Sequence, residues 1–204
     1  MNTQNKQALL VIISSPAGGG KDSAIRRLLK ILPNSAKLVT TTSRAKRPRD
    51  IEGGDHFFIS KEEFEKQLQQ GQFLEYNITD NKYYGICKNY FKKLQDNNDI
   101  ILAPIDVDGK KHFDDLRIPH LSIFLLPNNM DTLRERARRR GGMTEEMIEN
   151  RIRLGYEEIE RAKDYDYKLV NHDGKLDETV DNIAKIIKER LVGKGNIDKK
   201  ADLS

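Results

Sequence analysis

The chain is poor in cysteine: Cys87 is the only one among 204 residues, which excludes an internal disulfide. This usage suits a reducing compartment, and we expect a cytoplasmic protein. No apolar run is long enough to cross a bilayer, and the start MNTQNKQ lacks the basic segment and apolar core of a secretory signal. The histidines, His56, His112, His120 and His172, lack metal-ligand spacing, so we expect no structural zinc.

Charge is abundant and nearly balanced. Charged residues make up 33% of the chain and hydrophobic ones 37%, and the length favours a single globular domain. The net charge of +4 is compatible with nucleic acid, but equally with a small phosphorylated substrate. The arginine run RERARRR (134–140) belongs to no recognised nucleic-acid module, and we interpret Arg134 and Arg138 as a solvated helix face. We therefore expect neither nucleic acid nor a membrane as a partner.

Apolar runs alternate with segments of helical periodicity, which predicts an α/β fold with a parallel sheet. The candidate buried strands are 8–14, 38–43, 100–105, 121–126 and 167–170. Helical spacing covers 21–32, 61–70, 89–97, 130–140, 144–162 and 176–191. Short aromatic-rich strands at 56–59, 73–78 and 83–87 predict a small mixed or antiparallel lobe inserted after the second strand. Gly71 and Gly109 are interpreted as breaks between elements.

A glycine-rich stretch, SPAGGGKDS (15–23), lies between the first strand and the first helix. Its glycines allow several backbone N–H groups to converge on one anion, and the helix adds its positive N-terminal end. Lys21 supplies a mobile cation for the outer phosphates. A turn that binds nothing needs neither three glycines nor the lysine, so the stretch predicts a triphosphate site. Its residues are Ala17, Gly18, Gly19, Gly20, Lys21, Asp22 and Ser23.

Two positions of this stretch depart from the usual G-x-x-x-x-G-K-[S/T] pattern. Ser15 replaces the first glycine, a small change that the turn can accommodate. Asp22 replaces the hydroxyl residue that normally ligates magnesium. A carboxylate is also a magnesium ligand, which makes Asp22 a candidate for the metal. The alternative is an acidic residue that only complements the helix dipole.

A second cluster of phosphate-binding and base-reading residue types follows in 40–58 and 73–86. Arg44 and Arg47 lie three apart in a turn-like stretch, and arginine forks match phosphate oxygens. Glu75 on a short strand could accept two N–H groups of a purine edge, and the Tyr84 hydroxyl could hold a phosphate. Taken singly, these residues equally suit a solvated basic loop, a surface carboxylate and a packed aromatic ring.

Taken together, these segments resemble the guanylate kinase family from about Leu9 to Leu191. The matching motifs are TSRAKR (42–47), GDHFF (54–58), LEYNITDNKYYG (74–85), PID (104–106), RGGMTEEMIENR (140–151) and VNHD (170–173). The resemblance implies a P-loop NTPase core with a five-stranded parallel sheet, an inserted acceptor lobe with a small mixed sheet, and a helical lid. In this single domain the core would cover 7–36, 91–127 and 159–192, the lobe 37–90 and the lid 128–158. Residues 193–204 would form a flexible tail.

The resemblance also implies residue roles, with ATP and Mg²⁺ on one side and GMP or dGMP on the other. The acceptor would be bound by Thr40, Arg44, Arg47, His56, Glu75, Tyr84 and Asp106. Of these, Thr40, Glu75 and Asp106 would read the guanine, and the arginines with Tyr84 would hold its phosphate. Transfer would depend on Lys21, Arg44, Arg140 and Arg151, the last two as lid arginines. Asn171 matches an asparagine on the ATP side.

Three departures from the family pattern leave the acceptor open. His56 replaces a tyrosine, with a pH dependence of its own, and Ile86 replaces a hydroxyl residue that helps to read the base. Pro104 replaces the first aspartate of D-I-D, which suggests that magnesium is held by different oxygens here. Ribose 1,5-bisphosphate phosphokinases share the Lys-Asp-Ser ending of the phosphate loop and the apolar residue after Tyr-Tyr-Gly. This activity is therefore the alternative to a guanylate kinase.

A non-catalytic guanylate-kinase-like binding domain is the third interpretation. Retention of Arg47, Glu75 and Asp106 favours a nucleotide over the ribose acceptor, and retention of Lys21 with the loop glycines and the lid arginines favours an enzyme. We therefore expect a kinase for GMP or dGMP, as a monomer or a homodimer.

Overall fold

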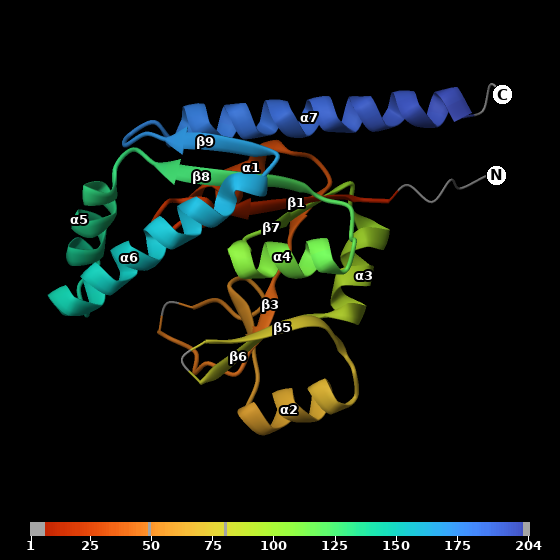
Figure 1. The fold of residues 1–204 in the computed structure, drawn as a ribbon. Coiled ribbons are helices and arrows are strands. Elements are labelled where there is room, and N and C mark those ends of the chain that lie inside the picture. The colour runs from red at the N-terminus through yellow and green to blue at the C-terminus, as the bar shows by residue number, and fades with distance from the viewer. Residues whose placement is uncertain (1–6, 49, 80, 202–204) are drawn as a thin grey trace.

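The computed structural model describes residues 7–48, 50–79 and 81–201, without the side chains of Arg140 and 194–201 (Figure 1). A five-stranded parallel sheet has the order β2-β7-β1-β8-β9, which confirms the predicted α/β fold. Its strands are β1 (Leu9–Ser14), β2 (Ser35–Lys37), β7 (Ile100–Ala103), β8 (Leu121–Pro127) and β9 (Tyr167–Asn171). No helix in the described ranges is both long and apolar enough to span a membrane.

Alternate residues of β1 face two different halves of the core. Leu9, Val11 and Ile13 pack with buried residues of α1 (Lys21–Ile31) and α7 (Leu176–Ala201). Leu10 and Ile12 pack on the other side with residues of α3 (Lys88–Asn97) and α4 (Val107–Asp115). Helices therefore cover both faces of the sheet, as the unbroken apolar sequence of β1 predicts.

A second, four-stranded mixed sheet has the order β4-β3-β6-β5 and lies with α2 (Lys61–Gln69) below the parallel sheet in Figure 1. Its strands are β3 (Thr40–Thr42), β4 (His56–Phe58), β5 (Phe73–Thr79) and β6 (Lys82–Cys87). The prediction of one strand at 38–43 in the parallel sheet was wrong. The second parallel strand is β2, whose sequence SAK carries no apolar run, and Thr40–Thr42 belongs to the mixed sheet.

Helices α5 (Met130–Arg140) and α6 (Glu145–Arg161) form a pair with its own small core, followed by a short 3₁₀ turn, η1 (Ala162–Asp164). Arg134 and Arg138, predicted to be only a solvated face of the helix, form ion pairs between the two helices. Arg134 donates from Nε and Nη2 to the two carboxylate oxygens of Glu149, at 2.7 and 3.1 Å, and Arg138 binds Glu145 in the same way. These arginines therefore join α5 to α6 across the surface.

Two further elements differ from the sequence predictions. Gly109 lies inside α4 rather than at a break, because Asp106 Oδ1 caps the helix by accepting from Gly109 N at 2.8 Å. A Cβ at position 109 would lie 2.0 Å from Ile105 Cγ2, so only glycine allows this close approach. Helix α7 continues to Ala201, beyond residue 191 where the predicted helix ends.

Candidate active site

The phosphate loop joins β1 to α1 and is held by side chains from distant segments. Gly18 and Gly20 have φ of 93° and 103°, a region that glycine adopts without strain. Asn171, buried at the end of β9, donates from Nδ2 to Gly19 O at 2.9 Å and accepts from Thr179 Oγ1 at 3.0 Å. The predicted ATP-side asparagine therefore fixes the backbone of the loop.

Arg136 of α5 holds the same loop from the other side. Its Nη1 donates to Gly18 O at 2.9 Å, and its Nη2 pairs with Asp173 of the β9–α7 turn. Beside the loop lies a cavity of about 320 Å³, called the donor cavity because ATP is expected beside this loop; it is lined by Gly18, Gly20, Ser23, Arg136, Arg139, Asn171, His172, Gly174 and Leu176. Sequence reasoning missed Arg136, because nothing within its arginine run distinguishes it from its neighbours.

Lys21, Asp22 and Ser23 form the first turn of α1, where Lys21 is half-buried and the other two are exposed. Burial raises the pKa of Glu158, on α6, to about 7, and the charge of Lys21 opposes that rise. That value already includes upward contributions from the charges of Asp106 and Asp108. The loop lysine thus lies in an acidic environment contributed by α6 and α4.

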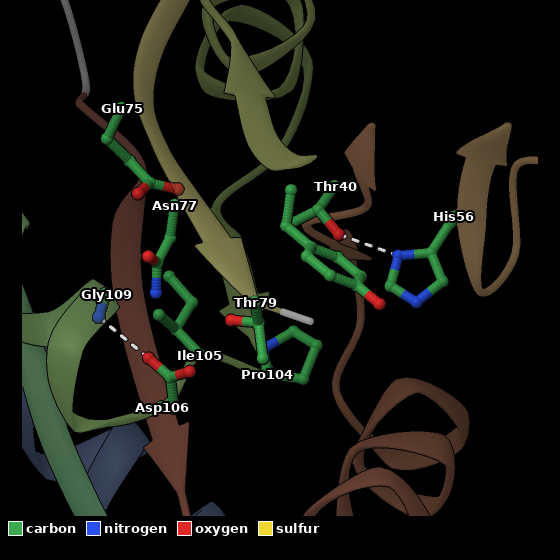
Figure 2. A pocket seen from close by; sticks show the side chains of 10 residues that line it. Thr40, His56, Glu75, Asn77, Thr79, Pro104, Ile105, Asp106 and Gly109 are labelled. Carbon is green, nitrogen blue, oxygen red and sulfur yellow. Dashed lines mark hydrogen bonds between the residues drawn. The ribbon is translucent and has the colours of Figure 1, made fainter. Parts of the chain in front are cut away.

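A second cavity, of about 280 Å³, opens between the two sheets (Figure 2). It is lined by Thr40, His56, Glu75, Asn77, Thr79, Tyr84, Pro104, Ile105, Asp106 and Gly109. The structure therefore brings together most residues of the predicted acceptor site, from β3, β4, β5, β6 and the start of α4. Arg44 and Arg47 are the exceptions, since neither lines this cavity.

Glu75 is the buried carboxyl group of this cavity. Burial raises its pKa, a hydrogen bond from His112 lowers it, and the charge of Asp106 raises it again. The Glu75 Oε2 and His112 Nδ1 atoms lie 3.0 Å apart, with the glutamate side chain 10% exposed and the histidine 39%. His112 of α4 is a site residue that the sequence reasoning missed, because no local pattern links it to β5.

His56 lies across the cavity from Glu75 (Figure 2). Its Nδ1 is 2.8 Å from Thr40 Oγ1, and its ring meets that of Tyr84 edge-on at 5.8 Å. Burial lowers the pKa of His56, and the nearby charge of Arg44 lowers it further. The lowered pKa favours the neutral imidazole, which presents one N–H as a tyrosine hydroxyl would present one O–H.

Arg44 lies buried beside His56. Its Nη1 pairs with Asp50 Oδ2 at 2.9 Å, and its guanidinium stacks over Phe58 with Cζ 5.3 Å from the ring centroid. Asp50 Oδ2 also accepts from Arg47 N at 2.7 Å, and these two bonds lower the pKa of Asp50. The side chain of Arg47 is exposed. One arginine is thus buried and paired, and the other lies exposed at the surface.

The two predicted lid arginines lie on α5 and α6. The side chain of Arg140, the last residue of α5, is outside the part that the structure describes. Arg151 of α6 is half-buried, with Nη1 3.6 Å from Met143 Sδ. Arg151 lines neither of the two cavities described above.

Comparisons with known proteins decide the family. The family model described as guanylate kinase matches residues 7–190. The chain belongs to the guanylate kinase family. A guanylate kinase of Wolbachia (from Brugia malayi) is 35% identical over 191 residues, covering 93% of this chain and 97% of the relative. That of Coxiella burnetii is 38% identical over 187 residues, covering 91% and 89%.

A solved structure agrees with this assignment. The crystal structure of guanylate kinase from Anaplasma phagocytophilum matches with a TM-score of 0.71 at 27% identity, covering 91% of this chain and 87% of that one. The resemblance seen in the sequence motifs is confirmed, and the chain is a phosphotransferase of a family that uses ATP.

Two departures from the family pattern now have a position in the structure. Ile86 is fully buried in the core with Leu10 and Ile12, so its side chain is a packing residue and not part of the cavity wall. Pro104 lines the acceptor cavity directly after β7. Asn77 and Thr79 also line it, and the sequence reasoning missed both because only their register on β5 places them there.

Proposed function

We propose that the protein transfers the γ-phosphoryl group of ATP to GMP or dGMP, giving ADP and the nucleoside diphosphate. The observation that carries this proposal is the largely buried Glu75 carboxyl group in the acceptor cavity, which Asp106 also lines. Ionised, Glu75 accepts the two N–H groups on the guanine edge, an arrangement that a ribose bisphosphate lacks. The single cysteine fits a cytoplasmic site of action.

The proposed mechanism is mainly alignment and neutralisation of charge. Loop N–H groups and Lys21 hold the ATP phosphates, while Arg44, Arg47 and Tyr84 hold the acceptor phosphate. An oxygen of the acceptor phosphate bonds to the γ-phosphorus as the bond to the β–γ bridging oxygen breaks. Neutral His56 donates its N–H to the acceptor phosphate.

We assign the moving parts by the boundaries expected from the sequence. Core segments at 7–36, 91–127 and 159–192 bind ATP, the lobe at 37–90 binds the acceptor, and residues 128–158 act as a lid. Closure of α5 and α6 would bring Arg140 and Arg151 to the transferring group and exclude water. The α5–α6 ion pairs support movement of this pair as one body.

The donor set fits a magnesium ion that is bound mainly by phosphates. Asp22 and Ser23 are exposed oxygen ligands at the start of α1, and no group of three acidic, His or Cys residues in the described ranges could hold a metal alone. Magnesium commonly takes one or two protein oxygens and completes its shell with phosphate and water. When bound near Asp22 and Ser23, it would neutralise charge on the phosphates of ATP.

Two experiments test the proposal. The first is an acceptor panel with ATP and magnesium, read as ADP release, containing GMP, dGMP, AMP and ribose 1,5-bisphosphate. Activity on the guanine nucleotides supports the proposal; activity on the ribose compound alone, or silence with every acceptor, contradicts it. The second measures the magnesium dependence of Asp22→Ala, with Asp22→Ser as the matched control. An unchanged dependence in Asp22→Ala removes Asp22 from the metal site.

A further inference from the structure

One strand of the acceptor cavity carries polar side chains beyond those with a proposed role. Glu75, Asn77 and Thr79 alternate along β5, so they share one face of the mixed sheet and follow one another down the cavity wall (Figure 2). Tyr76 and Ile78, between them, belong to the opposite, exposed face. Asn77 therefore lies between a buried carboxyl group and a hydroxyl group.

The orientation of the Asn77 amide is fixed by one hydrogen bond. Its Oδ1 accepts from the Ile78 backbone N–H at 2.7 Å, and this donor identifies the oxygen of the amide. Among the described residues, no hydrogen bond engages Nδ2, although the side chain lines the cavity. The NH₂ group is therefore a donor available to a bound acceptor.

The pairing of β5 with β6 shows why a donor at this position matters. Glu75 lies opposite Ile86 and Asn77 lies opposite Tyr84, so these four side chains share one face of the ladder. Ile86 offers no polar group and is fully buried. The strand β5 itself then supplies a donor, two residues from the Glu75 carboxyl group.

We propose that Asn77 is a specificity-determining residue, whose Nδ2 donates to the 6-oxo group of a 6-oxopurine nucleotide. The inference rests on the proposed function, in which Glu75 accepts the N–H groups of the same base edge. Guanine presents a carbonyl acceptor beside an N–H donor, whereas adenine presents an amino donor beside a ring nitrogen. A carboxylate beside an amide NH₂ matches the N–H at position 1 and the carbonyl at position 6 of guanine. With adenine, the carboxylate would face a ring nitrogen and the amide NH₂ would face an amino group, so neither would find a hydrogen-bond partner.

The test compares kcat/KM for GMP, 6-thio-GMP and AMP in the wild type and in Asn77→Ala. Sulfur at position 6 keeps the N–H groups of guanine and is a weaker hydrogen-bond acceptor for Asn77 than the 6-oxo group. We expect the wild type to prefer GMP over 6-thio-GMP by about tenfold, the range of one neutral hydrogen bond. In Asn77→Ala, kcat/KM for GMP falls by about the same factor, and the preference disappears.

Two further variants separate recognition from structure. Asn77→Asp keeps an acceptor for the Ile78 N–H and removes the donor, so it also loses the preference. Ile78→Ala alters the exposed face of β5 and keeps the preference. A GMP to 6-thio-GMP ratio that stays at the wild-type value in both Asn77 variants overturns the inference, as does an equal loss on both acceptors.

The wild-type measurement distinguishes failure of the Asn77 inference from failure of the proposed function. A wild type that phosphorylates no guanine nucleotide overturns the proposed function, and the role of Asn77 with it. A wild type that is active on GMP leaves the proposed function standing, whatever the Asn77 variants show.

Discussion

The donor cavity and the acceptor cavity are held in shape differently. On the donor side, Arg136 and Asn171 donate to carbonyl oxygens of the phosphate loop, so side chains fix a backbone. On the acceptor side, Glu75 pairs with His112, and Thr40 pairs with His56. The donor cavity is therefore shaped by contacts between side chains and the loop backbone, whereas the acceptor cavity is shaped by contacts between side chains. Under the proposed function, we expect substitutions on the acceptor side to change acceptor binding without changing ATP affinity.

The largest expected effect comes from breaking the acceptor side at Arg44. In Arg44→Ala the proposed clamp on the acceptor phosphate is lost and Asp50 loses its buried partner. We expect kcat/KM for GMP to fall by at least about 10³-fold, the scale of arginines in phosphoryl transfer. ATP affinity, measured by calorimetry, stays at the wild-type value because Arg44 lies outside the donor cavity.

Lys46→Ala is the matched control for that variant. It removes a charge that also lies over the Phe58 ring, at 5.9 Å, from the same loop. Its kcat/KM stays within a few-fold of the wild type. Near-normal turnover in Arg44→Ala would remove this arginine from the mechanism.

The reverse experiment breaks the donor side at Gly20. A Cβ there would lie 2.5 Å from Asn171 Nδ2, at a φ of 103°. Gly20→Ala should therefore push Asn171 off the loop and weaken ATP binding by about 10²-fold or more, the effect of roughly 3 kcal/mol. Binding of GMP, measured by calorimetry without ATP, should not change.

Gly71→Ala provides the control, because Gly71 also has a positive φ, 65°, and nothing lies within 4 Å of its added Cβ. That variant should lose some stability and keep its ATP affinity. Equal losses of ATP affinity in both variants would mean that backbone strain, and not the contact with Asn171, controls the loop.

The same contrast explains what the sequence could predict. The loop 15–23, the strand before it and the helix after it are local, and the glycines with Lys21 were enough to predict them. The clamps on that loop are not local: Arg136 lies 118 residues from Gly18, and Asn171 lies 152 residues from Gly19. Short-range periodicity carries no information on such contacts, so only the family resemblance pointed to Asn171, and nothing pointed to Arg136.

The acceptor cavity could be predicted only through family motifs, for the same reason. Thr40, Glu75 and Asp106 come from β3, β5 and the cap of α4, which meet only after both sheets form. The strand β2 was missed because SAK is short and half-buried, without the apolar run that marks β1. Helix α4 was missed because Gly109 resembles a chain break, although the contact with Ile105 requires it.

A smaller effect is expected from substitution of His112, which tests how charge in the acceptor cavity controls activity. The titratable groups that act on Glu75 are His112 and Asp106, while β6 presents Ile86. His112 lowers the pKa of Glu75, so His112→Ala should raise that pKa further. Because the ionised carboxylate accepts the guanine N–H groups, the acid limb of kcat/KM for GMP should move to higher pH.

Lys111→Ala removes an exposed charge from the same helix, and should leave the pH profile unchanged. The pH dependence of the KM for ATP should stay that of the wild type in both His112→Ala and Lys111→Ala. A His112→Ala profile that falls uniformly at all pH values would assign His112 a packing role instead.

The smallest expected effect lies at Glu158, whose pKa is influenced by the charges of Lys21 on α1 and Asp106 at the start of α4. Its pKa is raised to about 7 from 4.5, mainly by burial. Between pH 4.5 and 7 the unfolded state loses the Glu158 proton at lower pH than the folded state does, so the free energy of unfolding falls as pH rises.

Glu158→Gln has no carboxyl group to ionise, and its Tm should exceed that of the wild type at pH 8 by about 2–4 °C, the effect of roughly 1 kcal/mol. At pH 4.5 the difference in Tm should largely vanish, because Glu158 is then protonated to a large extent in both the folded and the unfolded wild type. A stabilisation that is equal at the two pH values would mean that packing, and not the ionisation of Glu158, sets the effect of this residue.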